Sequence, residues 1–239
     1  MQVTPGRDEF ADLAGRHRMV PVRARILGDR LTPVGMFERL AGDGPAFLLE
    51  SVEGGERWAR WSFLGWDPLF TVVSRNGRTT VEGAALDAGG DPLEALEDIV
   101  EAFDTPDLPG LPPLHSGLVG YLGSDAVRYV EHLPGRPPDD RGFPEMAWQA
   151  VGTLAAFDRF TQTVTLIRNV PAEAGAAGYD DAVARLEAAA AALGGPQPPP
   201  RPVPAFGKVP DSVAATGREA YMAGVARAIE HIRAGDVFQ

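Results

Sequence analysis

The sequence contains no cysteine. This absence excludes disulfides, zinc–thiolate sites, iron–sulfur clusters and a cysteine nucleophile, and it leaves the redox compartment undetermined. The sequence also lacks an apolar run approaching about 18 residues, and no charged segment followed by an apolar one marks its N-terminus as an export signal. We therefore expect no membrane-spanning segment and a cytoplasmic location.

Basic residues are few. Lys and Arg number 22 against 33 Asp and Glu, which gives a formal net charge of −11. Such an excess of negative charge repels phosphate backbones and anionic lipid unless basic residues are concentrated in one patch, and the sequence shows no such patch. Nucleic acid and membrane surfaces are therefore not expected as partners.

The residues that are present predict a globular α+β protein. Of 239 residues, 44% are hydrophobic and 23% are charged, which is typical of one or two folded domains. Asp91-Pro92 opens an amphipathic helix with Leu93, Leu96, Ile99, Val100 and Phe103 on one stripe. Two other helices are predicted, one capped by Thr32 and ended by Gly42, and one over Tyr179–Leu193. Strands are predicted over Val20–Leu27, Ala46–Val52, Ala59–Leu64, Leu69–Arg75, Thr79–Glu82, Gly117–Leu122, Met146–Phe157 and Thr163–Val170.

Short turns join most of these strands, so the predicted sheets are mostly antiparallel and pack against about three main helices. The strongest hairpin signal is Asn76-Gly77. A second hairpin is expected around Asp158-Arg159.

Composition divides the chain into four parts. Residues 1–19 mix charge, Gly and Pro and are expected to be a loose or weakly helical lead-in to a domain over 20–195. A proline-rich linker follows over 196–210, and a further domain begins at 211–239. Its first helix has a predicted capping box of Thr216 and Glu219, and a strand is expected to start at Asp236. Because this helix and strand would lack partners, the sequence is expected to be cut short.

Patterns typical of catalysis are absent. The nucleophile-elbow pattern G-x-S-x-G does not occur, and Gly123-Ser124-Asp125 is the nearest approach to it. The four histidines are never paired at i+3 or i+4, and there is no phosphate-binding G-x-x-x-x-G-K-[ST] loop. We therefore expect no catalytic residue and no metal ligand in this chain.

One segment indicates binding. An apolar strand ends in Glu50 and Ser51, and Arg60-Trp61-Ser62 follows a Gly54-Gly55 turn. If the two strands pair, an acid, a hydroxyl, a cation and an indole converge, which suits a zwitterionic amino acid. The alternative is that these polar groups only cap the ends of strands at a turn.

Four longer segments carry a family resemblance: LLESVEGGERWARWSFLGWDP (48–68), GLVGYLGSDAVRYVEHLP (117–134), FPEMAWQAVGTLAAFDR (143–159) and REAYMAGVARAIEHIRAGDVFQ (218–239). In this order they resemble the N-terminal half of anthranilate synthase component I. The resemblance implies part of a Mg²⁺-dependent lyase of tryptophan biosynthesis that converts chorismate and glutamine-derived ammonia to anthranilate and pyruvate. It also implies a glutamine amidotransferase subunit, component II, as partner.

The same resemblance implies where ligands bind. The chorismate and Mg²⁺ ligands of the family lie in the other half, so this chain alone is expected to be inactive. A serine of the Leu-Leu-Glu-Ser motif, which contributes to tryptophan feedback inhibition, maps onto Ser51, and Leu49, Glu50, Arg60 and Trp61 are carried over with it. Two alternatives stay open: the N-terminal half of aminodeoxychorismate synthase component I, and a catalytically inert amino-acid-binding module.

Overall fold

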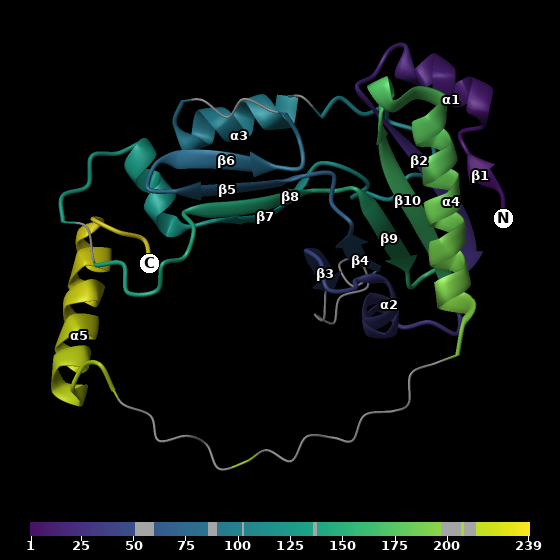
Figure 1. The fold of residues 1–239 in the computed structure, drawn as a ribbon. Coiled ribbons are helices and arrows are strands. Elements are labelled where there is room, and N and C mark those ends of the chain that lie inside the picture. Colours follow the sequence, from purple (N-terminus) through teal and green to yellow (C-terminus); the bar gives the residue numbers. More distant parts are fainter. Residues whose placement is uncertain (51–59, 86–89, 102, 136–137, 197–206, 208–213) are drawn as a thin grey trace. The chain divides into compact units, whose positions relative to one another are not determined.

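The structure, a computed structural model, describes the chain except residues 51–59, 86–89, 102, 136–137, 197–206 and 208–213 (Figure 1). The chain forms two compact units, Met1–Pro198 and Pro199–Gln239, and each is described by itself. No helix in the described part is long and apolar enough to cross a membrane.

A six-stranded sheet organises the first unit. Its strand order is β1-β2-β10-β9-β4-β3, and every neighbouring pair is antiparallel. The strands are β1 (Val3–Thr4), β2 (Met19–Leu27), β10 (Thr163–Pro171), β9 (Thr153–Asp158), β4 (Trp61–Trp66) and β3 (Ala46–Glu50). The strand β3 is therefore at one edge, with Glu50 as its last residue.

A second, four-stranded antiparallel sheet has the order β6-β5-β8-β7. Its strands are β6 (Arg78–Glu82), β5 (Thr71–Arg75), β8 (Met146–Ala150) and β7 (Leu118–Leu122). The hairpin predicted at Asn76-Gly77 is confirmed: it joins β5 to β6, and both residues have positive φ, 52° and 73°. Positive φ at both central positions is what a two-residue hairpin turn requires.

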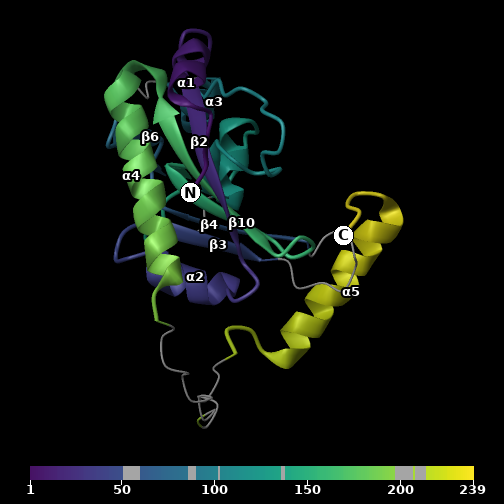
Figure 2. The same ribbon diagram turned by 90° about the vertical axis from the view of Figure 1, so that its right-hand side faces the viewer.

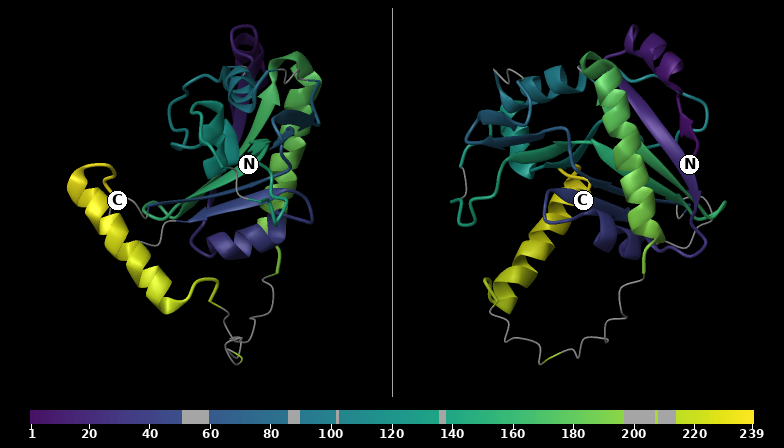
Figure 3. Two further views of the ribbon diagram at one scale, coloured as in Figure 1. Left: turned by 90° about the vertical axis from the view of Figure 1, so that its left-hand side faces the viewer. Right: turned by 45° about the vertical axis from the view of Figure 1, so that its right-hand side comes forward.

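Helices α1 (Arg7–Ala14), α2 (Pro33–Leu40) and α4 (Gly175–Gly194) pack on one face of the six-stranded sheet (Figures 2 and 3). The core between them holds side chains from sheet and helices, among them Val22, Leu64, Leu166, Met36 and Leu186. Thr32 caps α2 as predicted, since its Oγ1 accepts a hydrogen bond from the Gly35 N–H at 3.1 Å. The mixed composition and antiparallel sheets confirm the α+β prediction.

Helix α3 (Pro92–Glu101) belongs to the second core, with Phe70, Val72 and Met146 of the four-stranded sheet. Ile99 is buried as predicted, but the neighbouring Val100 is 54% exposed. Adjacent residues are about 100° apart around a helix, so burial of Ile99 does not require burial of Val100. Two short 3₁₀ helices, η1 (Ser124–Tyr129) and η2 (Ala172–Ala174), complete the unit.

Three further expectations about the first unit differ from the structure. The N-terminal lead-in, expected to be loose or weakly helical, contains helix α1, which buries Phe10 and Leu13 in the main core. The described residues of this unit include four α-helices, α1 to α4, and the fourth of them, α1, lies in the N-terminal segment. The strand predicted over Met146–Phe157 is two strands, β8 and β9, in different sheets.

The break between β8 and β9 lies at Val151-Gly152. A Cβ atom at Gly152 would overlap the carbonyl oxygen of Asp67, so only glycine allows the backbone to change sheets so close to this loop. The hairpin partner of β10 is therefore β9 alone, as the register of Asp158 with Thr163 shows.

The second unit contains α5 (Arg218–Ala234). Its N-cap is Gly217, and no side chain caps it, so the predicted capping box of Thr216 and Glu219 is wrong. Its end at Gly235 is confirmed, since this residue has the left-handed φ of 82° typical of a helix stop. Residues 236–239 form no strand in the structure.

Candidate functional site

The binding segment of the sequence analysis lies at the end of β3 and the start of β4. These strands pair in antiparallel register, with Glu50 opposite Ser62 and Leu49 opposite Phe63. The pairing that the hypothesis required is therefore present. Ser51 lies outside the described residues, so the structure gives no position for its hydroxyl.

Arg159 connects the two strand ends. Its Nη2 donates to Glu50 Oε1 at 2.8 Å and to Ser62 Oγ at 3.1 Å. In the sequence, Arg159 is recognisable only as part of a turn, and its contact with Glu50 was not predicted. Predicting this contact would have required the pairing of β4 with β9. That pairing places Asp158 opposite Trp61, and therefore Arg159 beside the start of β4.

Arg60 has a different acidic partner, Asp158 at the end of β9. The guanidinium binds the carboxylate through two bonds, Nε to Oδ1 at 2.9 Å and Nη2 to Oδ2 at 2.6 Å. The Phe160 N–H and the Thr161 hydroxyl donate to the same carboxylate, at 3.0 and 2.9 Å. Asp158 is thus a buried acceptor, with a side chain that is 3% exposed.

These bonds control the protonation of both groups. Mainly through its hydrogen bonds, Arg60 lowers the pKa of Asp158 to about 2, although burial alone would raise it. The same bonds raise the pKa of Arg60. The pair is therefore fully ionised at neutral pH.

Aromatic side chains surround this ion pair. The Arg60 guanidinium lies over the Trp61 ring at 5.0 Å and near the Phe160 ring at 5.6 Å. The rings of Trp61 and Phe63 are stacked, with centroids 6.0 Å apart and planes 15° apart. Leu49, directly opposite Phe63, is 43% exposed. An exposed apolar surface thus adjoins the charged groups.

The predicted residues fall on two faces of the sheet. Side chains alternate along a strand, so Glu50 and Ser62 lie on the face that α2 and α4 cover, whereas Leu49 and Trp61 lie on the other. The structure brings Glu50 to Arg159, and Arg60 to Trp61 and Asp158. Because Asp158 and Arg159 are neighbours, the two groups meet at the end of the edge strand β3.

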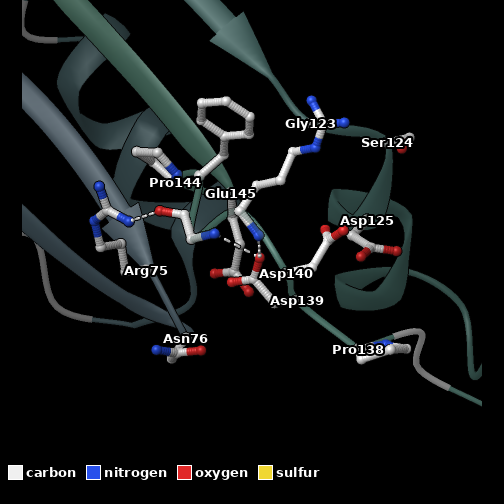
Figure 4. Close-up of a pocket in the computed structure, with 13 residues that line it drawn as sticks. Arg75, Asn76, Gly123, Ser124, Asp125, Pro138, Asp139, Asp140, Pro144 and Glu145 are labelled. Atoms are coloured by element: carbon white, nitrogen blue, oxygen red, sulfur yellow. Dashed lines mark hydrogen bonds between the residues drawn. The ribbon is translucent and has the colours of Figure 1, made fainter. Parts of the chain in front are cut away.

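A second group of polar residues lies in the loops beside the four-stranded sheet (Figure 4). It contains Gly123-Ser124-Asp125, the nearest approach to the nucleophile-elbow pattern. Ser124 and Asp125 line a pocket of about 440 Å³ together with Asp139, Asp140 and Glu145. None of the described residues that line it is a histidine. Asp125 is bound to Arg128 at 3.0 Å, and Asp139 accepts backbone N–H groups of its own loop. The described lining of this pocket therefore offers Ser124 no histidine base.

A magnesium site needs several converging oxygen ligands. Among the residues that the structure describes, no three His, Asp or Glu side chains converge in this way. The described part of the chain therefore does not fit a bound Mg²⁺ ion.

Comparisons with known proteins agree with this architecture. A likeness in fold is found to the crystal structure of anthranilate synthase component I from Streptococcus pneumoniae, with a TM-score of 0.56 and 23% sequence identity. It covers 89% of this chain and 46% of that one.

Curated relatives are more similar in sequence. Anthranilate synthase component 1 of Mycobacterium tuberculosis (strain ATCC 25618 / H37Rv) is 40% identical over 100% of this chain and 48% of its own length. The protein of the same name from Thermus thermophilus is 39% identical over 93% of this chain and 46% of its own. The chain thus spans about half the length of the curated relatives that it matches.

The family model described as chorismate binding enzyme matches residues 44–239, a range that includes most of both sheets and α5. This match covers more than half of the sequence. The chain therefore belongs to the family of chorismate binding enzymes.

Proposed function

We propose that the chain is the N-terminal half of anthranilate synthase component I. The complete enzyme, a lyase, would convert chorismate and ammonia from glutamine to anthranilate and pyruvate, with component II as the amidotransferase partner. The support is the 40% identity to a relative of that name over the whole chain and about half of the relative. The domain boundaries at 20–195, 196–210 and 211–239, the Mg²⁺ ligands in the other half and the cytoplasmic location belong to the same proposal.

We further propose that the end of β3 and the start of β4 form part of a tryptophan feedback site. One observation carries this proposal: β3 ends in an exposed leucine and a carboxylate that binds Arg159, and the residue before Arg159, Asp158, binds Arg60. A zwitterionic aromatic amino acid needs an acceptor for its ammonium group, a donor for its carboxylate and an apolar surface for its ring.

The described residues supply the polar groups on one face of the sheet and the apolar groups on the other, and the two faces meet at the edge strand β3. The Glu50 carboxylate suits the ammonium group, and Arg159 suits the carboxylate, since it uses only Nη2 for its two bonds to described residues. Leu49, Phe63 and Trp61 offer the apolar surface. Ser51, the residue after Glu50, would add a hydroxyl group to these ligand-binding groups.

The proposal predicts that residues 1–239 alone form no anthranilate. The reason is that the described part holds neither a nucleophile–base pair nor a cluster of metal ligands. The measurement is anthranilate fluorescence with chorismate, ammonia and Mg²⁺, and the complete enzyme is the positive control. Turnover by purified 1–239 above the blank would contradict the proposal.

Glu50→Gln in the complete enzyme should raise the tryptophan concentration for half-inhibition by about 5- to 10-fold, because a neutral amide replaces a charged acceptor. Uninhibited turnover should stay unchanged. Glu82→Gln, at the exposed end of β6, is the matched control and should leave the inhibition curve in place. If Glu50→Gln and wild type gave the same tryptophan inhibition curve, the end of β3 would not be part of the tryptophan site.

A further inference from the structure

A pocket of about 370 Å³ lies beside β1 and β2, at the edge of the six-stranded sheet opposite to β3. It is lined by Gln2, Thr4, Arg23, Ala24, Arg25, Pro109 and Gly110. Thr4 is directly opposite Arg23 across the two strands. Arg23 and Arg25 are two residues apart on β2, so their side chains leave the same face of the sheet. Two guanidinium groups therefore stand together in one pocket.

Neither arginine forms an ion pair with a described residue. Arg23 Nη2 donates to the Pro109 carbonyl oxygen at 2.6 Å, and Arg25 Nη2 donates to Thr163 Oγ1 at 3.0 Å. Elsewhere in the same unit, Arg60, Arg128, Arg159, Arg168 and Arg185 all bind carboxylates. In a chain with 33 acidic residues, this pocket thus holds two positive charges, and no carboxylate of the described residues is in contact with them.

One guanidinium nitrogen of Arg23 lacks a hydrogen bond to the described residues. Its Nη1 is buried and has no partner in the structure. A buried charged donor without an acceptor is unfavourable, because it has lost its bonds to water without replacing them. Burial, and next the charge of Arg25, lower the pKa of Arg23, while Glu9 acts weakly in the opposite direction. An anion beside both arginines would offset the repulsion between their charges.

We propose that this pocket binds a small oxyanion, a phosphate or carboxylate group, between Arg23 and Arg25. Guanidinium groups bind such planar or tetrahedral sets of oxygen atoms through paired N–H donors. The Thr4 hydroxyl and the Gln2 amide are further donors on the pocket wall. The site lies on β2, apart from the residues of the proposed tryptophan site, and does not depend on that proposal.

The test is titration of the full chain, labelled with ¹⁵N in arginine, with inorganic phosphate at constant ionic strength set by NaCl. The Nε–Hε signals of Arg23 and Arg25 should shift together and saturate with a dissociation constant on the order of 1 mM. Arg25→Gln should weaken binding by about 10-fold or more, since Arg25 is exposed and its loss leaves the fold intact. Arg78→Gln, which removes an exposed arginine from β6, is the control and should bind as wild type.

A parallel titration with acetate identifies the source of the oxyanion. Equal affinity for acetate indicates a carboxylate ligand, and preference for phosphate indicates a phosphorylated one. The proposal is overturned if neither anion shifts these signals in a saturable way. It is also overturned if Arg78→Gln weakens binding as much as Arg25→Gln, because the effect would then be general charge screening.

Discussion

Replacement of Asp158 by Asn should lower the free energy of unfolding of the chain by about 2–3 kcal/mol. The carboxylate is buried and accepts two bonds from Arg60, one from the Phe160 N–H and one from the Thr161 hydroxyl. An amide keeps one acceptor oxygen and turns an NH₂ group toward the guanidinium. The Arg60 side chain is 43% exposed, so water solvates it after the change and the loss stays below that of a fully buried pair.

Urea denaturation of the chain measures this difference. Asp125→Asn is the matched control, because Asp125 binds Arg128 on an exposed 3₁₀ helix. Exposed ion pairs contribute about 0–1 kcal/mol, so the control should lose less than half as much. Equal losses for the two variants would mean that burial of the Asp158 carboxylate adds nothing to the stability.

The same pair predicts a pH dependence. The pKa of Asp158 is about 2 in the folded chain, below the value of about 3.9 for an unfolded aspartate. A lowered folded-state pKa contributes stability that is fully present above pH 4 and is lost as the pH falls through about 2. The difference in stability between wild type and Asp158→Asn should therefore be constant from pH 7 to pH 5 and shrink from pH 4 to pH 2.

Ser51→Ala should raise the tryptophan concentration needed to inhibit the complete enzyme by roughly 10- to 150-fold. This range corresponds to the loss of one hydrogen bond to a charged group, about 1.5–3 kcal/mol. Ser51 directly follows Glu50, the last residue of β3, and we propose that its hydroxyl binds a charged group of tryptophan. Uninhibited turnover should stay nearly unchanged, since we place the chemistry in the other half of the enzyme.

Ser124→Ala is the control for this variant, because Ser124 lines the acidic pocket beside η1 and not the end of β3. It should leave the inhibition curve unchanged. An unaltered curve for Ser51→Ala would exclude Ser51 from the site and leave the Leu-Leu-Glu-Ser segment with a structural role only.

Local signals in the sequence predicted local structure well. The Thr32 cap, the Asn76-Gly77 turn and the Gly235 helix end each depend on a few neighbouring residues, and all three are confirmed. The capping box at Thr216 failed although its pattern is present, because Gly217 took the cap position and no side-chain bond formed. A cap motif shows where a helix begins only to within a residue or two.

The pairing of strands that are far apart in the sequence could not be predicted from the sequence. The strand over Met146–Phe157 has a continuous pattern, and only the loop around Asp67, far away in the sequence, shows why it divides at Gly152. The partners of the residues in the candidate tryptophan site were unpredictable for the same reason. Glu50, Arg60 and Trp61 were recognised from their types and spacing, but Asp158 and Arg159 become their partners only through the pairing of β4 with β9.

The most direct test of the proposed function is a crystal structure of the complete enzyme grown with L-tryptophan. Our account predicts difference density for the amino acid at the end of β3, with its ammonium group at the Glu50 carboxylate and its ring against Leu49. Density for tryptophan at a place that touches none of Leu49, Glu50, Ser51, Arg60 and Trp61 would contradict the account.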